Sequence, residues 1–299
     1  MFLGVDIGGT KTAVCLGTYD GQVLDKIKFA TTDVQDTIHN IIEAGKKLTT
    51  GKKIKAVGIS CGSPQDSKKG IIQAPPNLPD WVDVPIVKLM EEAFGVPAFL
   101  ANDANACALA EWKYGAGKGT ENMIFLTFGT GMGAGLILNG KLYAGTCGMA
   151  GEAGHMRLTP TGPEGYGKAG SFEGYCSGGG IVRLGKAMGY EYPSTKDICD
   201  AAKAGDENAQ RIIDESATRL GQGLSVLIDL MNPQKIVIGS IFARAEELFR
   251  PKMEEILQKE CLSYNLQVCS VVPARLGEAI GDIAALSVGV IGWEETHNV

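Results

Sequence analysis

The sequence predicts an α/β protein with two lobes, and three observations lead to this expectation. Short apolar runs that favour β-strands alternate with longer segments of helical period along the chain. The 299 residues are enough for two lobes, each with its own hydrophobic core. The 41 glycines indicate many turns in which the backbone can approach a ligand closely.

The composition argues against several classes of partner. The formal net charge is −6 and no cluster of Lys and Arg stands out, so we expect no nucleic-acid partner. The eight cysteines form no CxxC pair and no dense framework, which is typical of reduced thiols in a cytoplasmic protein. No apolar run reaches about 18 residues and the first residues do not read as a signal peptide, so we expect neither a membrane span nor secretion.

The first half of the chain opens with a β-meander, because three short apolar runs are separated by the turn sequences DIGGT and TYDGQVL. The segment 61–79 is expected to be a loop, because SPQD and APPNLPD are clusters of residues that break regular structure. The expected elements, in order, are strands at 2–5, 11–18 and 23–30, a helix at about 36–49, a strand at 54–60, a helix near 85–94, a strand at 97–101 and a helix at about 104–113.

The second half starts with the strand MIFLTF and the hairpin LILNGKLY, whose Asn139-Gly140 pair suits a tight β-turn. Helices and strands then alternate to the end of the chain. The expected elements are helices near 178–188, 196–203 and 207–231, a strand at 235–240, a helix at about 242–258, a strand at 267–273 and a last helix from about 279.

Two glycine-rich turns each join a pair of expected strands. In DIGGTKT, at 6–12, consecutive glycines let successive backbone N–H groups point into one concavity and bind an anion, and Thr10 and Thr12 add hydroxyl donors. GTGMGAG, at 129–135, is a second turn of the same kind. Neither turn opens a helix as a Rossmann fingerprint does, and neither carries the Walker pattern. An ordinary Gly-Gly hairpin would explain one such turn, whereas two of them indicate phosphate binding.

Asp103 follows an apolar strand and begins a helix in ANDANACALAEW. Helix capping is one explanation, because Asn and Asp are preferred N-cap residues. The alternative places this carboxylate at the carboxyl edge of a sheet, where ligands of α/β proteins usually bind and where it could accept a hydroxyl proton. A Gly-Ser turn in VIGSIFARAEELF could lie against a nucleotide base or ribose, although many αβ units have such a turn.

Four motifs, in this order and at these separations, resemble the ROK kinases: Asp6–Thr10, NDAN at 102–105, the GTGxGxG hairpin and GEAGH at 151–155. These are bacterial sugar kinases of the actin-like ATPase superfamily, and the resemblance covers essentially the whole chain. It implies a two-lobed, ribonuclease H-like α/β fold with an active-site cleft between the lobes. Residues 1–115 would form the N-terminal lobe, on which the last helix (about 284–299) packs back, and residues 116–283 the larger C-terminal lobe.

The resemblance also implies roles for individual residues. Asp103 would be the catalytic base, and Asp6 would help to hold Mg²⁺ through water. The expected sugar ligands are Asn77, Asn102, Asp103, Glu152, His155 and Glu173. The expected ATP-binding residues are Asp6, Gly8, Gly9, Thr10, Lys11, Thr12, Thr130, Gly131, Gly133, Gly239 and Ser240. The alternatives are a packed histidine at 155 and solvated loop carboxylates at 152 and 173.

The long loop after His155 departs from the pattern of many family members. Those proteins carry CxCGxxGCxE, in which three thiolates and the histidine bind structural zinc. Here Glu164, Tyr166 and Ser171 stand where the cysteines would be, so we expect no structural zinc. We expect the loop to be stiffened by the packing of Tyr166, Phe172 and their neighbours. His155 would then be free to form a hydrogen bond with a sugar hydroxyl.

The function implied is transfer of the γ-phosphoryl group of MgATP to a sugar hydroxyl. The 6-hydroxyl of glucose is the first choice, because glucose is a frequent substrate in the family. The alternatives are N-acetylmannosamine, N-acetylglucosamine, allose or fructose, and, from another class, a non-catalytic sugar sensor or a repressor without a DNA-binding domain. The phosphate motif begins at residue 6, so we expect no helix-turn-helix domain ahead of it. The family implies a homodimer.

Overall fold

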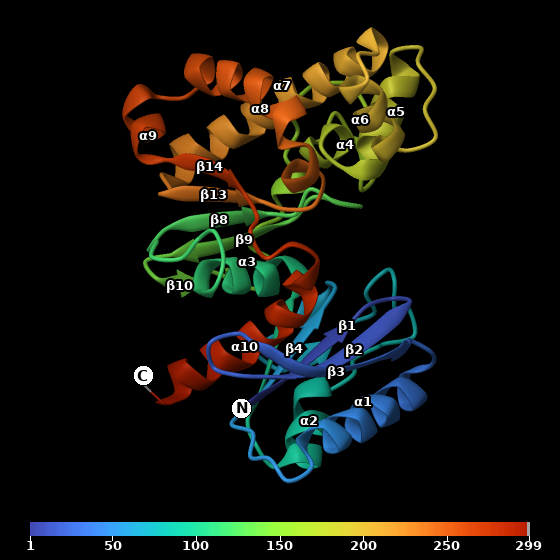
Figure 1. Ribbon diagram of the computed structural model, residues 1–299, viewed down its shortest axis with the longest axis vertical. Coiled ribbons are helices and arrows are strands. Elements are labelled where there is room, and N and C mark those ends of the chain that lie inside the picture. The colour runs from blue at the N-terminus through green and yellow to red at the C-terminus, as the bar shows by residue number, and fades with distance from the viewer. Residues whose placement is uncertain (298–299) are drawn as a thin grey trace. The chain divides into compact units, whose positions relative to one another are not determined.

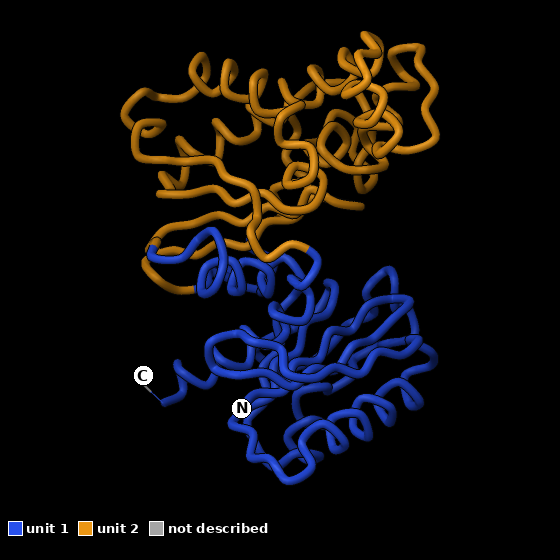
Figure 2. Tube along the Cα trace, in the orientation of Figure 1, with its two compact units in different colours: residues 1–119, 142–150, 278–299 blue, residues 120–141, 151–277 orange. Residues whose placement is uncertain are grey.

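The chain forms two compact units, each built around a five-stranded sheet (Figures 1 and 2). The structure is a computed structural model and describes residues 1–297; residues 298 and 299, the end of the expected last helix, lie outside the described residues. Unit 1 comprises Met1–Gly119, Leu142–Ala150 and the chain from Glu278 onward, and unit 2 comprises Thr120–Lys141 and Gly151–Gly277. The expected α/β class is confirmed.

The sheet of unit 1 has the strand order β3-β2-β1-β4-β7. Its strands are β1 (Phe2–Ile7), β2 (Lys11–Gly17), β3 (Val23–Ala30), β4 (Val57–Cys61) and β7 (Ala98–Asn102). The strands β1, β4 and β7 are parallel, and their register places Ile7 beside Cys61 and Cys61 beside Asn102. Because these strands end together, the residues that follow them all lie at one edge of the sheet.

Helices cover both faces of this sheet (Figure 1). Successive residues of a strand face opposite sides, so Leu3 and Val5 pack on one face while Phe2 packs on the other with Leu286. Glycine in β4 lets the last helix approach closely, because a Cβ at Gly58 would lie 2.0 Å from Ala285 O. The helices of this unit are α1 (Val34–Thr49), α2 (Ile86–Phe94), α3 (Asp103–Lys113) and α10 (Ile280–His297).

The sheet of unit 2 has the order β10-β9-β8-β13-β14, and its two longest helices pack against each other (Figure 1). The strands are β8 (Met123–Leu126), β9 (Ala134–Leu138), β10 (Lys141–Leu142), β13 (Lys235–Ile238) and β14 (Ser270–Pro273). The helices are α4 (Phe172–Tyr175), α5 (Gly178–Ala187), α6 (Thr195–Lys203), α7 (Glu207–Met231), α8 (Ile241–Glu260) and α9 (Ser263–Val268). Short elements are η1 (Ala153–His155), β11 (Glu164–Gly165), β12 (Lys168–Ala169) and η2 (Gly277–Ala279).

Most of the expected elements are confirmed, and two segments differ. The expected strand at 267–273 is a strand only over Ser270–Pro273, because the residues before it form α9. The carboxylate of Asp229 accepts hydrogen bonds from Leu262 N and Asn265 Nδ2, which hold the start of this exposed helix. The expected loop at 61–79 contains a hairpin of β5 (Gln65–Asp66) and β6 (Ile71–Ile72). None of the helices formed by residues 1–297 is long and apolar enough to cross a membrane.

Candidate functional site

The first glycine turn joins β1 and β2 at the carboxyl edge of the unit 1 sheet. Gly8 N donates to Lys11 O at 3.1 Å, which closes the turn. A Cβ at Gly8 would lie 2.9 Å from Lys11 O, and one at Gly9 would lie 2.7 Å from Asn77 Cβ. Both positions therefore require glycine, and Asn77 lies directly beside the turn.

The two threonines of this turn have different environments. Thr31 Oγ1 donates to Gly8 O at 2.6 Å, so its contact of 2.8 Å with Thr12 Oγ1 uses the hydroxyl hydrogen of Thr12. Thr12 is also fully buried, whereas Thr10 and Lys11 are exposed. The hydroxyl group of Thr12 thus stabilises the turn. Of the two threonines expected to donate to a ligand, only Thr10 has an exposed hydroxyl group.

Asn102 and Asp103 share the junction between β7 and α3. The N-cap of the helix is Asn102, whose Oδ1 accepts from Asn105 N at 2.7 Å. Asp103 Oδ1 accepts from Ala104 N at 2.8 Å. The residue Asp103 reaches solvent, yet enough protein surrounds its carboxyl group that burial raises the pKa, while the bond from Ala104 N lowers it. Because Asn102 caps the helix, the carboxylate of Asp103 is not needed as the N-cap and lies at the sheet edge.

Asp6 lies half-buried near the end of β1, next to the first turn of α10. A Cβ at Gly281 would lie 3.0 Å from Asp6 Oδ2, so the carboxylate packs closely against this helix. Burial raises the pKa of Asp6 to about 6, and the charges of Asp282 and Asp103 add to this effect. Asp282 in turn forms an ion pair with Lys26 at 2.6 Å.

Asp6 is the carboxylate expected to hold Mg²⁺ through water. Within the described part of the chain, no cluster of three or more His, Cys, Asp and Glu side chains could hold a metal ion. Mg²⁺ in nucleotide sites keeps several waters and takes one or two carboxylates together with phosphate oxygens. One half-buried carboxylate at Asp6, beside a phosphate-type turn, fits this arrangement.

The second glycine turn, in unit 2, forms a hydrogen bond with the carboxylate of Glu173. Gly129 N donates to Gly131 O at 3.1 Å, and Met132 N donates to Glu173 Oε2 at 3.0 Å. A Cβ at Gly131 would lie 2.9 Å from the same carboxylate oxygen. One oxygen of the expected sugar ligand Glu173 is therefore engaged by the expected phosphate turn.

The motif GEAGH packs directly onto this turn. A Cβ at Gly151 would lie 2.0 Å from Ala134 O, and one at Gly154 would lie 2.1 Å from Met132 O. These glycines bring η1 against the hairpin backbone, while the residues at its two ends, Glu152 and His155, remain exposed. The structure thus brings three expected sugar ligands, Glu152, His155 and Glu173, to the second glycine turn.

The loop after His155 is ordered differently from the expectation. Tyr166 is 78% exposed and contacts the His155 ring edge-on at 6.3 Å between centroids, so it does not pack into the loop. Phe172 is fully buried, as expected, and a Cβ at Gly223 would contact its ring. The expectation was wrong for Tyr166 because its backbone has φ 45°, in the left-handed region, at the tip of the β11–β12 hairpin.

Hydrogen bonds close this loop at its base. Ser171 is buried; its Oγ accepts from Gly174 N at 3.1 Å and donates to Gly165 O at 3.3 Å. Thr159 Oγ1 lies 2.9 Å from the hydroxyl of Tyr175. A serine thus stands at one of the positions where the family's pattern has cysteine, and its hydroxyl links β11 to α4.

The Gly-Ser turn before α8 meets the second glycine turn. Gly239 N donates to Leu126 O at 2.9 Å, and a Cβ at Gly129 would lie 3.3 Å from Ser240 Oγ. Gly178 N, at the start of α5, donates to Gly129 O at 2.7 Å. The segment SGGG at 177–180 is not among the site residues expected from the sequence, although a run of glycines after an N-cap serine was the available signal.

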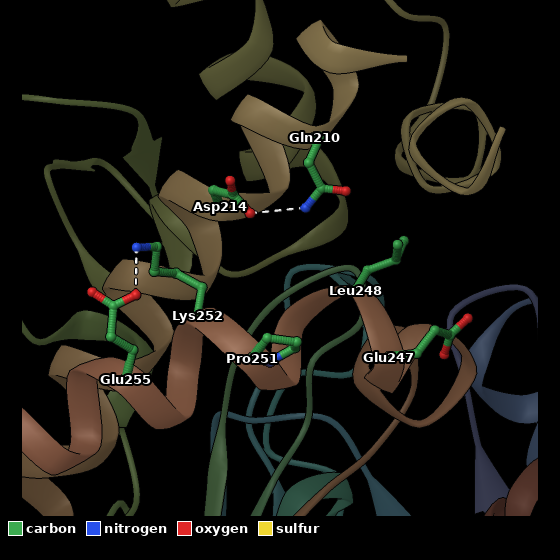
Figure 3. A pocket seen from close by; sticks show the side chains of 7 residues that line it. All are labelled: Gln210, Asp214, Glu247, Leu248, Pro251, Lys252 and Glu255. Carbon is green, nitrogen blue, oxygen red and sulfur yellow. Dashed lines mark hydrogen bonds and ion pairs between the residues drawn. The ribbon is translucent and has the colours of Figure 1, made fainter. Parts of the chain in front are cut away.

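A pocket of about 270 Å³ lies between α7 and α8 in unit 2, away from these residues (Figure 3). Its polar groups pair with one another or with neighbours: Gln210 donates to Asp214 at 2.8 Å and Lys252 to Glu255 at 2.7 Å. None of the expected site residues lines it. The full lining is Gln210, Asp214, Glu247, Leu248, Pro251, Lys252 and Glu255.

Comparison with known proteins agrees with this geometry. The sequence matches the ROK family over residues 2–288. A glucokinase from Thermotoga maritima is 33% identical over 305 aligned residues, covering 96% of each chain. An N-acetylmannosamine kinase from Escherichia coli is 34% identical over 271 residues, covering 89% of this chain and 91% of the relative. A ROK family glucokinase from Streptomyces griseus, crystallised with glucose and AMPPNP, has a TM-score of 0.75 and 31% identity, covering 96% of this chain and 98% of its own.

The two α/β units and the glycine turn in each define a protein of the actin-like ATPase class, with its ribonuclease H-like fold. The resemblance deduced from the four motifs is confirmed. The chain belongs to the ROK family.

Proposed function

We propose that this protein is an ATP-dependent hexose kinase that transfers the γ-phosphoryl group of MgATP to a sugar hydroxyl. The 6-hydroxyl of glucose is the first acceptor, which agrees with the relatives named as glucokinases. The observation that carries the proposal is the position of Asp103, which immediately follows β7 at the sheet edge where β1 leads into the first glycine turn. Asp103 and the first glycine turn therefore lie at the same edge of one sheet, on either side of the end of β4.

The backbone of the two glycine turns would hold the phosphates of ATP. Their N–H groups are fixed by the turn geometry, so they need little reorganisation during the reaction. Thr10 and Lys11, both exposed, add side-chain donors to the first turn. In unit 2, the residues that would bind ATP are Thr130, Gly131, Gly133, Gly239 and Ser240. Magnesium, held through Asp6 and water, would neutralise charge on the phosphates.

Asp103 would orient the attacking hydroxyl and accept its proton. Phosphoryl transfer proceeds through a loose transition state, so the proton leaves late and a strong base is unnecessary. The raised pKa of Asp103 brings the carboxylate closer to the working pH of a general base. Its bond from Ala104 N occupies one oxygen and leaves the other for the sugar.

The sugar ring would be bound by acceptors that match its hydroxyl donors. Carboxylates form strong hydrogen bonds with hydroxyl groups, which suits Glu152 and Glu173. His155 would bind through either ring nitrogen. Asn77 and Asn102 complete the set from unit 1. The E. coli relative makes N-acetylmannosamine the second candidate acceptor.

We further propose that the protein acts as a cytoplasmic homodimer without structural zinc, and that it has no nucleic-acid or membrane partner. The eight cysteines are free thiols, which suits a reducing compartment. The hydrogen bonds of Ser171 would stabilise the long loop without a metal ion.

The test is ADP release from MgATP, measured by a coupled assay over glucose, mannose, allose, fructose, N-acetylmannosamine and N-acetylglucosamine. Asp103→Asn is expected to lose several orders of magnitude in kcat while still binding the sugar, because it keeps the shape and loses the base. Asp80→Asn, at an exposed aspartate near Asn77, is the matched control. Near-normal turnover by Asp103→Asn would remove Asp103 from the mechanism, and the absence of sugar-dependent ADP release with every sugar would overturn the proposal.

A further inference from the structure

The tip of the β11–β12 hairpin is a tight turn that begins with a tyrosine. Tyr166 and Gly167 both have positive φ, 45° and 71°, close to the 52° and 71° of Asn139 and Gly140 in another hairpin of the same unit. Turns of this kind favour Asn at the first position, and a bulky side chain is strained there. The turn itself therefore gives no reason for a tyrosine at residue 166.

The packing of the loop does not explain the tyrosine either, because its side chain is largely exposed. The contact that its ring makes is with His155, at 6.3 Å between the ring centroids and an interplanar angle of 78°. Aromatic rings attract each other in this edge-on arrangement, which restricts how one ring lies relative to the other. The turn thus presents the Tyr166 ring to one of the expected sugar ligands.

Hydrogen bonds hold the hairpin against the segment that contains His155. Lys168 Nζ donates to His155 O at 2.7 Å, and Arg157 Nη1 donates to Ala169 O at 2.7 Å. Both bonds join β12, the strand that follows Tyr166, to the chain at and just after His155. The position of Tyr166 beside His155 is therefore fixed by the fold of unit 2, in addition to the contact between the two rings.

The imidazole ring of His155 has little else to hold its orientation. The residue is exposed at the end of η1, and within residues 1–297 no hydrogen bond reaches either ring nitrogen. A side chain binds a ligand best when neighbouring groups already hold its rotamer before the ligand arrives. The structure places the ring of Tyr166 where it can do this.

We infer that Tyr166 is a positioning residue, which holds the imidazole ring of His155 in the orientation that binds a sugar hydroxyl group. This inference rests on the proposed function. Removal of the Tyr166 ring leaves His155 free to adopt other rotamers, so part of the binding free energy of the sugar is used to order it. The loss falls on sugar binding, because only the sugar ligand loses its support.

The experiment replaces Tyr166 by the residue that its turn favours. Tyr166→Asn makes the turn Asn-Gly, so it should be at least as stable as wild type in urea unfolding while it lacks the ring. We expect the KM for the best acceptor sugar to rise about 3-fold to 10-fold, with kcat and the KM for MgATP at saturating sugar unchanged. Tyr166→Phe, which keeps the ring, should restore the wild-type KM. Tyr264→Asn, at an exposed tyrosine of α9, is the control.

A double-mutant cycle with His155→Ala tests whether Tyr166 acts through His155. His155→Ala alone should raise the KM for the sugar, and the addition of Tyr166→Asn should raise it no further. The inference alone would be overturned by a wild-type KM in Tyr166→Asn, or by an equal effect of Tyr166→Asn with and without the imidazole ring.

The same assays separate the inference from the proposed function. Absence of ADP release by the wild type with every sugar would overturn the proposed function, and the inference with it. If Tyr166→Asn is less stable than wild type, Tyr166→Gly provides the same comparison, because glycine adopts positive φ without strain.

Discussion

The environment of Asp6 leads to a prediction about stability. Burial and the charges of Asp282 and Asp103 raise the pKa of this carboxyl group from 3.8 to about 6. A raised pKa means that the folded protein binds the proton more tightly than the unfolded chain does. Ionised Asp6 therefore destabilises the protein: its favourable protonated form is lost as the pH rises from 3.8 to about 6. Asp6→Asn, which resembles the protonated acid, should be more stable than wild type at higher pH.

The magnitude follows from the same two pKa values. Since one pKa unit corresponds to about 1.4 kcal/mol, the full difference in the free energy of unfolding is about 3 kcal/mol at pH 8. The difference falls to about half of this value at pH 5 and is smaller still at pH 4, because the wild-type carboxyl group is then increasingly protonated in both states.

Urea unfolding followed by tryptophan fluorescence is the appropriate assay. All three tryptophans, Trp81, Trp112 and Trp293, belong to unit 1, so their signal reports on the unit that contains Asp6. The measurement is made without MgATP, with Asp25→Asn, at an exposed aspartate of β3, as the control. The reasoning would be refuted if Asp6→Asn gave the same stability difference at pH 5 and pH 8. Addition of MgATP should stabilise wild type more than Asp6→Asn, because the variant lacks the carboxylate proposed to hold Mg²⁺ through water.

Two further predictions concern unit 2. Gly154→Ala should lower the free energy of unfolding by about 1–3 kcal/mol, because its Cβ would lie 2.1 Å from Met132 O, a backbone atom that cannot move alone. Unfolding followed by circular dichroism measures this difference. The control is Gly179→Ala, whose Cβ would meet only the flexible end of Arg183, and it should stay close to wild type. The purified protein should contain no stoichiometric zinc, because serine and tyrosine replace thiolate ligands in the loop; one equivalent that survives dialysis against a mild chelator would contradict this.

The parts of the fold that could be predicted are those determined by local sequence. The Asn139-Gly140 turn is one example: both residues have positive φ, 52° and 71°, as a tight hairpin requires. Asp103 is another, because an acidic residue that follows an apolar strand and begins a helix must lie at the sheet edge. The extent of α9 was missed, because Val268 lies in a β-favouring run and the bonds to Asp229 that hold the helix start come from α7.

The parts that could not be predicted depend on residues distant in the sequence. Thr12 was expected to donate to a ligand, and its hydroxyl hydrogen is instead used by Thr31, which the pairing of β2 with β3 brings beside it. The contact of Tyr166 with His155 likewise depends on the hairpin that β11 and β12 form. The motif GEAGH is recognisable in the sequence, but the physical reason for its glycines is not. Only the structure shows that they contact the backbone of Met132 and Ala134.

The bond from Met132 N to Glu173 has a thermodynamic consequence. This carboxylate belongs both to the expected sugar ligands and, through Oε2, to the second glycine turn. If the proposed roles hold, a sugar that draws Glu173 toward itself changes the support of the turn proposed to bind phosphate, and a nucleotide that shifts this turn changes the position of the proposed sugar ligand. Linkage requires the two effects to be equal, so each substrate must alter the affinity of the other by the same factor. One side chain would thus make the two binding equilibria interdependent.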